Sequence, residues 1–353
     1  MEICSNHQAL LTLVKAGLWE QSFKSIFNEP IDFDAVYQLA EEQGVVGLVA
    51  AGFEYVVDAR VPKEIVLTFI GSTLQVEQRN QAMNLFIRDA VSKMQDAGIK
   101  TLLVKGQGLA QCYERPLWRP SGDIDFLFDD ENYRKAVKFM LPLSSGNKPE
   151  GKYSKHLGLS VGQWYVELHG SLRSSLSTRI DKEIDAVHDD TFNNGNTRVW
   201  RNGDVDIMLP GVDNDIFFVF THYIKHFYKE EGASLRQICD WCRLLWTYRD
   251  SIDVSVLQDR IQRAGLISEW KVFATFAVEY LGMPVEAMPL LGDEKILHRK
   301  AKMLAGLILN DVKLNKLSKT YKIAKLFPFQ TLRYIPSIVF EVNWLKLKER
   351  LFK

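Results

Sequence analysis

One stretch, residues 119–128 (Arg-Pro-Ser-Gly-Asp-Ile-Asp-Phe-Leu-Phe), constrains this chain more than any other. If it forms a strand, Asp123 and Asp125 point to one face while Ile124 and Phe126 point into a core, because side chains alternate along a strand. Aspartate is disfavoured inside strands, so two in one strand require an explanation. Two such close carboxylates repel each other unless a cation lies between them. A hard divalent ion, Mg²⁺ or Mn²⁺, suits oxygen donors.

Two neighbouring stretches add to this pattern. Residues 99–104 predict a short buried strand that runs through Lys105-Gly106-Gln107-Gly108 into a helix over residues 109–113. Backbone N–H groups at a glycine turn before a helix suit phosphate, and Lys105 adds a full charge. Further on, residues 164–169 alternate strictly, which places Glu167 on one strand face as a third carboxylate.

The order of these elements resembles the DNA polymerase β-like nucleotidyltransferase superfamily. Within it, the chain is similar to a large bacterial nucleotidyltransferase family with a K-G…R-P…G-D-I-D…V-E-L-H signature. The specific part covers roughly residues 99–170, and a weaker similarity continues through His222, His226, Arg236 and Asp240. The superfamily usually has Gly-Ser or Gly-Gly in the glycine turn, whereas this chain has Gly106-Gln107. The matching residues are Lys105-Gly106, Arg119-Pro120, Gly122-Asp123-Ile124-Asp125 and Val166-Glu167-Leu168-His169.

The carboxylates fit a two-metal centre for nucleotidyl transfer, in which two divalent ions neutralise charge on the attacking and leaving oxygens. We expect Asp123 and Asp125 to bridge both ions and Glu167 to hold the ion nearest the acceptor hydroxyl. Glu167 is also a candidate to serve as the general base or to lie beside it. The resemblance implies the same assignment. His169 either orients Glu167 or merely ends the strand.

The remaining candidate residues are predicted to bind the nucleotide. Lys105 and the turn are expected to hold the β- and γ-phosphates, and Arg119 is a candidate for a bidentate phosphate contact. The full predicted set is Lys105, Gly106, Gln107, Gly108, Arg119, Ser121 and Gly122.

The expected activity is transfer of an NMP from an NTP, for which we expect ATP, to a hydroxyl of a small molecule or a protein. One alternative is a phosphotransferase that uses the same carboxylates. Another is a nucleotide-binding or scaffold protein in which Gln107 marks lost catalysis.

Composition excludes several other classes. Lys+Arg and Asp+Glu both total 44, so no global field attracts nucleic acid, and no basic-aromatic array offers a template track. No apolar run approaches the ~20 residues of a membrane span. The first residues carry no leader-like pattern, so we expect a cytoplasmic protein.

The predicted fold is α+β, with a small mixed β-sheet nucleotidyltransferase core at 99–210, an N-terminal helical region at 1–98 and a C-terminal helical domain at 211–353. Helices are predicted over residues 34–43, 46–55, 62–96, 132–141, 180–187 and 339–351. Hairpins are predicted over residues 156–172 and 197–209, the second around Asn202-Gly203.

Some residues with chemical potential have a plainer interpretation. Asp204 and Asp206 nearly repeat the first aspartate pair, but a hairpin turn already explains Gly203. Cys239 and Cys242 fit a buried helix face better than a metal site. His222 and His226 share a helix face, which is either an interdomain contact or a surface that closes over the nucleotide. Arg236 and Asp240 have the spacing of a structural ion pair, and the basic stretch 295–325 is a solvated face or binds an anionic acceptor or membrane surface.

Overall fold

The computed structural model describes residues 3–24, 30–56, 61–148, 155–229, 232–310 and 316–335. Within them lies a seven-stranded mixed sheet in the order β3-β4-β5-β2-β1-β7-β6. The pairs β2–β5 and β1–β7 are parallel and the other neighbours are antiparallel. The predicted α+β fold is therefore confirmed. The strands are β1 (Leu102–Val104), β2 (Ile124–Leu127), β3 (Gly146–Lys148), β4 (His156–Val161), β5 (Trp164–His169), β6 (Thr197–Asn202) and β7 (Val205–Pro210).

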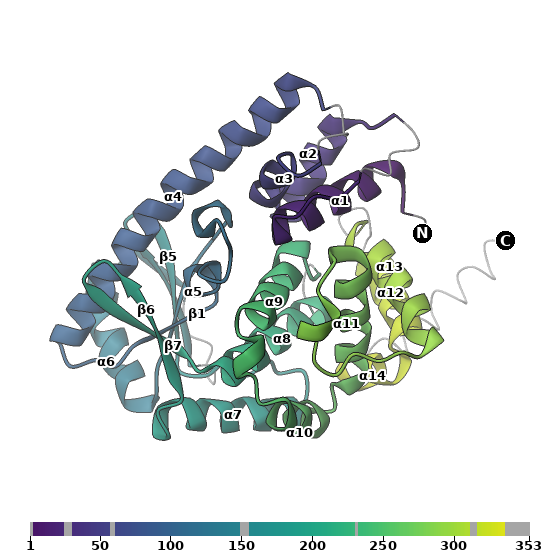
Figure 1. Cartoon of the computed structure of the whole chain (residues 1–353). Coiled ribbons are helices and arrows are strands. Elements are labelled where there is room, and N and C mark those ends of the chain that lie inside the picture. The colour runs from purple at the N-terminus through teal and green to yellow at the C-terminus, as the bar shows by residue number, and fades with distance from the viewer. Residues whose placement is uncertain are drawn as a thin grey trace, which may run out of the picture.

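Helices that precede, separate and follow the strands in the chain flank this sheet (Figure 1). The first group is α1 (Ser5–Trp19), α2 (Phe33–Glu42), α3 (Val46–Gly52) and α4 (Lys63–Asp96). Within the sheet region lie α5 (Gly106–Ala110), α6 (Asp130–Met140) and α7 (Thr178–Asn193). The last group is α8 (Val212–Lys229), α9 (Leu235–Thr247), α10 (Val254–Ala264), α11 (Ile267–Leu281), α12 (Lys295–Ile308), α13 (Lys316–Leu326) and α14 (Pro328–Tyr334).

The two faces of the sheet belong to different apolar clusters, because strand side chains alternate. One face carries Leu103 and Phe126, which pack under α4 and α6 in one cluster. The opposite face carries Leu102, Val104 and Leu127, which join a larger cluster with the N-terminal and C-terminal helices. The aspartate pair lies on this second face. The division at residues 98 and 210 stays a prediction.

The long helix α4 connects these regions. It runs from beside α1–α3 to the far side of the strands (Figure 1). Phe69 packs with the N-terminal helices, whereas Met83, Ile87 and Val91 pack on the sheet. The spacing of apolar residues along 62–96 predicts that Leu74 and Leu85 lie on the packing face of this helix, but they are 48% and 54% exposed. The prediction was wrong for these two because the helix changes packing partner along its length.

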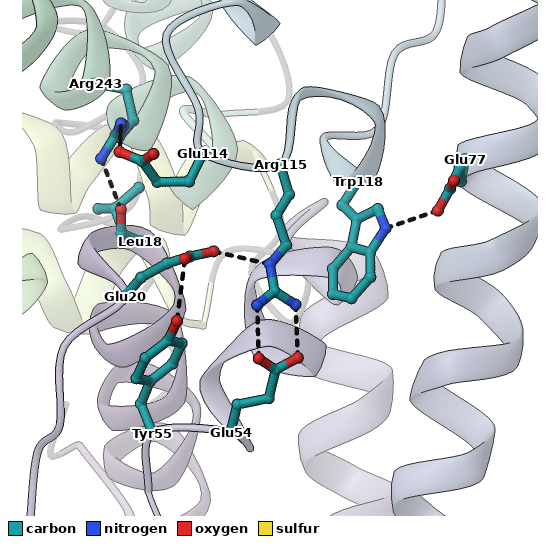
Figure 2. A network of polar contacts seen from close by, with 9 residues as sticks. All are labelled: Leu18, Glu20, Glu54, Tyr55, Glu77, Glu114, Arg115, Trp118 and Arg243. Atoms are coloured by element: carbon teal, nitrogen blue, oxygen red, sulfur yellow. Dashed lines mark hydrogen bonds and ion pairs between the residues drawn. The ribbon is translucent and has the colours of Figure 1, made fainter.

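The segment between α5 and β2 is held by the N-terminal helices. Arg115 forms a bidentate ion pair with Glu54 and a further contact with Glu20. Trp118, in the 3-10 helix η1 (Pro116–Trp118), donates to Glu77 of α4. Figure 2 shows that these contacts run from one short loop to residues just after α1 and α3 and to α4. The N-terminal helices therefore position the loop that leads into the aspartates.

Most predicted elements are present with small shifts. The hairpin predicted around Asn202-Gly203 forms, but its two-residue turn is Gly203-Asp204, one residue later, because Asn202 pairs with Val205; Gly203 has φ +64°, as this turn requires. The helix expected at 109–113 instead begins at Gly106. Asp32 caps α2 by accepting from the Ala35 N–H. The helix expected over 339–351 lies outside the described residues. Among the described helices, none has the length and apolar character needed to cross a bilayer.

Candidate active site

The aspartate pair lies at the start of β2 and faces the large apolar cluster rather than α4 and α6. Asp125 is only 2% exposed, whereas Asp123, one residue before the strand, is more exposed. Ile124 and Phe126 are buried on the other face. The alternation inferred from the sequence is therefore present. It buries the carboxylate of Asp125 and leaves that of Asp123 nearer the surface.

Glu167 joins this pair through strand pairing. In the parallel pair β2–β5, Asp125 lies directly opposite Glu167. One oxygen each of Asp123, Asp125 and Glu167 lies within 4.8 Å of the others. Burial, followed by the charge of Asp125, raises the pKa of Asp123. The three acidic side chains therefore converge, as their positions in the sequence predict.

Lys105 places a positive charge against the deeper carboxylate. Its Nζ lies 2.7 Å from Asp125 Oδ1. Burial alone would lower the pKa of Lys105, but the charge and the hydrogen bond of Asp125 raise it. The backbone of Lys105 is at φ +57°, in the left-handed region that non-glycine residues rarely adopt. Such strain persists where surrounding structure enforces it, and it often marks functional positions.

The glycine turn is divided between cavity and core. Gly106 lines the cavity beside the carboxylates. Gly108 is buried, and a Cβ there would lie 2.9 Å from a methyl group of Leu209. Gln107 is 1% exposed and its amide donates to Asn80 Oδ1 of α4. The Gln107 side chain is therefore directed away from the carboxylates and braces the turn against α4.

The side-chain bonds of Arg119 and Ser121 organise the loop, and Arg119 also lines the cavity. The guanidinium of Arg119 donates from Nε and Nη2 to the two oxygens of Asp240, at 2.7 and 2.6 Å. Its Nη1 donates to Ser121 Oγ at 2.7 Å. The expected pairing of Arg236 with Asp240 was wrong, because Asp240 bonds Arg119 and Tyr113 while Arg236 donates to the carbonyl of Pro120. The spacing of Arg236 and Asp240 along one helix could not show that Asp240 bonds a residue from another part of the chain.

Two histidines lie beside the third carboxylate. His169 Nε2 is 2.8 Å from Asp125 Oδ1 and 3.3 Å from Glu167 Oε2. His156 Nε2 is 3.1 Å from the same Glu167 oxygen. Burial alone would raise the pKa of Glu167, but contacts with both imidazoles hold it well below its usual range. His169 therefore contacts both carboxylates.

Our reading of the sequence did not single out His156. A signal for it existed, because a hairpin with a two-residue turn at Gly162-Gln163 pairs residue 156 with residue 169. The structure has that register.

A cavity of about 1290 Å³ opens from the carboxylates toward the C-terminal helices. Its walls include Gly122 of the aspartate loop, Arg173 after β5, and His222 and Lys225 of α8. Nε2 of His222 lies 3.1 Å from Nε2 of His226. Burial, followed by the charge of Lys105, lowers the pKa of His222 well below its usual value. The cavity is large enough for a nucleotide and part of an acceptor.

The alternative sites considered in the sequence have structural roles. Asp206 forms an exposed ion pair with Arg201 across the hairpin. Cys239 and Cys242 are fully buried in α9. Within the described ranges, the groups of three or more residues that could hold a metal ion both contain Glu167. The metal-binding potential of the described residues is therefore concentrated at β2 and β5.

The chain was compared with protein-family models, curated proteins and solved structures. Residues 29–282 match a family model described as "Uncharacterised nucleotidyltransferase". No curated protein and no solved structure matches. The match spans the N-terminal helices from α2, the whole sheet and the C-terminal helices through α11. The chain therefore belongs to this family of uncharacterised nucleotidyltransferases.

Proposed function

We propose that this chain transfers an NMP from an NTP, with ATP as the expected donor, to a hydroxyl acceptor, and that it belongs to the DNA polymerase β-like superfamily. The observation that carries the proposal is the convergence of Asp123, Asp125 and Glu167 at the end of the cavity. In the reaction an acceptor oxygen bonds to the α-phosphorus, the bond from that phosphorus to pyrophosphate breaks, and the acceptor proton passes to water.

The donor set fits divalent cations. Three carboxylates within a few ångströms, one of them almost fully buried, carry more negative charge than Lys105 alone offsets. Mg²⁺ or Mn²⁺ held by Asp123, Asp125 and Glu167 would supply neutralisation of the charge that develops on the reacting oxygens. The raised pKa of Asp123 agrees with this fit, because a bound cation would offset both of its causes, burial first and the charge of Asp125 second.

The surrounding residues have distinct tasks in this proposal. Lys105 lies beside both the carboxylates and Gly106, where it can orient the phosphates of the nucleotide. Glu167 acts as a ligand, because contacts with the two imidazoles lower its pKa and keep its carboxylate ionised.

Arg119 and Ser121 are assigned to holding the aspartate loop. The phosphate contact predicted for Arg119 would require it to leave Asp240. The backbone of the Gly106–Gly108 turn and Gly122 remain predicted nucleotide contacts. The acceptor is expected to enter from the α7 and α8 side of the cavity.

The test combines labelled nucleotides with matched aspartate variants. The protein is incubated with α-labelled NTPs, Mg²⁺ and a lysate as acceptor source, and label transfer and pyrophosphate release are measured. We expect Asp123→Asn with Asp125→Asn to abolish transfer. Asp204→Asn with Asp206→Asn, which alters the exposed hairpin pair, should leave it intact.

The other outcomes separate the alternatives. Release of ADP in place of pyrophosphate would identify a phosphotransferase. Absence of any thermal shift with any NTP, with and without Mg²⁺, would favour a scaffold. Transfer that survives the Asp123 and Asp125 changes would place the active site elsewhere.

A further inference from the structure

The hairpin formed by β4 and β5 places two imidazoles side by side. His156 and His169 are direct cross-strand partners, and their ring centroids are 4.8 Å apart with an interplanar angle of 32°. Glu167 lies on the same face of β5, two residues before His169. Two nitrogen donors and one oxygen donor therefore point to a common place at this edge of the cavity.

The distances between these donors resemble those around a bound metal ion. Ligands at about 2.0–2.2 Å from a zinc ion, separated by tetrahedral or right angles, lie roughly 3.0–3.4 Å from one another. The Glu167 oxygen lies 3.1 Å from His156 Nε2 and 3.3 Å from His169 Nε2. All three donor atoms fall within 4.8 Å of one another.

A purely structural ion pair explains this arrangement less well. His156 Nε2 is buried, yet it makes no directed hydrogen bond within the described residues despite its closeness to Glu167. A buried nitrogen without such a bond is costly unless another partner completes it. His169 by contrast contacts both Asp125 and Glu167. The position facing His156 Nε2 therefore calls for a further partner.

We infer that His156, Glu167 and His169 form a binding site for a transition-metal ion such as Zn²⁺, Mn²⁺ or Co²⁺. Imidazole nitrogen selects these ions over Mg²⁺ and Ca²⁺, which prefer oxygen donors alone. An ion can reach the site from the cavity, because His156, Glu167 and His169 all line its wall. Three protein donors leave coordination positions open toward that cavity, as in metal sites that bind substrate.

This site adjoins the carboxylate cluster, since Glu167 belongs to both. The metal requirement of the centre is then mixed, with an oxygen-only side at Asp123 and Asp125 and a nitrogen-containing side at the two histidines. Binding at the histidines needs no transfer reaction. Only its consequence for catalysis, a preference for Mn²⁺ or Zn²⁺ with Mg²⁺ over Mg²⁺ alone, rests on the proposed function.

The experiment follows Co²⁺ binding to untagged, metal-free protein by its visible absorption, and Zn²⁺ binding by calorimetry. Loss of a residue that only supports a metal ligand typically weakens binding about 10–100-fold. We expect His156→Ala, which removes a ligand itself, to weaken Co²⁺ and Zn²⁺ binding at this site by at least as much. His298→Ala, which removes an exposed imidazole of α12, should change nothing. Circular dichroism checks that each variant is folded.

A second measurement reads the ligands directly. X-ray absorption of the Zn²⁺-loaded protein should show two imidazole nitrogens, falling to one in His156→Ala. Equal Co²⁺ affinity in wild type and His156→Ala, or a shell with fewer than two imidazoles in the wild type, would overturn the inference and leave the histidines as supports for Glu167.

The variant Asp123→Asn separates this inference from the proposed function. It should lose NMP transfer but keep the cobalt spectrum, because Asp123 is not among the donors of the histidine site. A wild-type protein that binds Co²⁺ through two imidazoles but transfers no NMP would uphold the site and refute the transfer reaction. Loss of the cobalt spectrum in folded Asp123→Asn would count against the histidine site.

Discussion

Glu269 of α11 is a carboxyl group that is fully buried among the C-terminal helices. The hydroxyl of Tyr228 donates to its Oε1 at 3.2 Å, while its Oε2 has no hydrogen-bond partner within the described residues. Burial raises the pKa of Glu269 from 4.5 to about 7. The folded chain therefore favours the protonated form of this residue, and its ionisation acts against folding.

The sign of the pH dependence follows from proton binding. Between about pH 4.5 and 7 the native state binds more protons at Glu269 than the unfolded state, so stability falls as pH rises. Over that pH interval, ionisation of Glu269 lowers the free energy of unfolding by at most about 3 kcal/mol. We expect Glu269→Gln to match the wild type near pH 4 and to be more stable at pH 8, in urea unfolding. Glu286→Gln, at an exposed position, should show no such pH-dependent difference, and an equal gap at both pH values would refute the explanation.

For single residues, the sequence predicted which side chains share a face of the sheet better than it predicted which side chains bond each other. Alternation along two strands was enough to place Asp125 and Glu167 on one face, because their strands pair in register. Arg119 shows the limit. Its charge indicated an anionic partner, but the partner proved to be Asp240, 121 residues away in the chain. Nothing local in a sequence distinguishes a carboxylate from a phosphate as the group that a guanidinium will meet.

Elements with strong local signals were predicted nearly to the residue. The long helix α4 follows a proline and ends before Ala97-Gly98, and the hairpin signal at Asn202-Gly203 is one residue from the turn that forms, Gly203-Asp204. Elements whose position depends on other parts of the chain were predicted less well. The N-terminal helices carried no visible chemistry, yet they brace the loop that carries the site (Figure 2).

The closest contact in this bracing is between backbones. A Cβ on Gly47 of α3 would lie 2.1 Å from the carbonyl oxygen of Trp118, in the loop before the aspartates. Helix and loop can approach this far only because glycine has no side chain. Arg115 and Trp118 then fix the loop with ion pairs and a hydrogen bond.

We predict that Gly47→Ala will separate α3 from this loop, lower stability by about 1–3 kcal/mol as overpacking does, and reduce NMP transfer. Gly71→Ala is the matched control, because Gly71 lies in α4 with no atom within 4 Å of an added Cβ. It should stabilise the protein by about 0.5–1 kcal/mol. Urea unfolding and the transfer assay measure both. A Gly47→Ala protein as stable and active as wild type would show that the contact does not set the loop.

At the scale of the whole molecule, the sheet and the C-terminal helices line the large cavity at the carboxylates. The Arg119–Asp240 pair joins the aspartate loop to α9 directly behind it, with side chains 7% and 4% exposed. Tyr113 donates to the same carboxylate at 2.7 Å. Removing one member of a buried pair leaves an uncompensated charge, whereas neutralising both avoids this cost.

We therefore predict that Asp240→Ala will lose about 3–5 kcal/mol of stability, while Arg119→Met with Asp240→Asn will recover much of it. The asparagine keeps an acceptor for Tyr113. The double variant also decides what Arg119 does. If Arg119 only organises the loop, NTP affinity measured by calorimetry should stay within about threefold of wild type, since no phosphate contact is lost. A loss of more than about tenfold, or 1.4 kcal/mol, in a double variant of restored stability would instead show that Arg119 leaves Asp240 to bind the nucleotide. Nucleotide binding would then break the ion pair that joins the aspartate loop to α9.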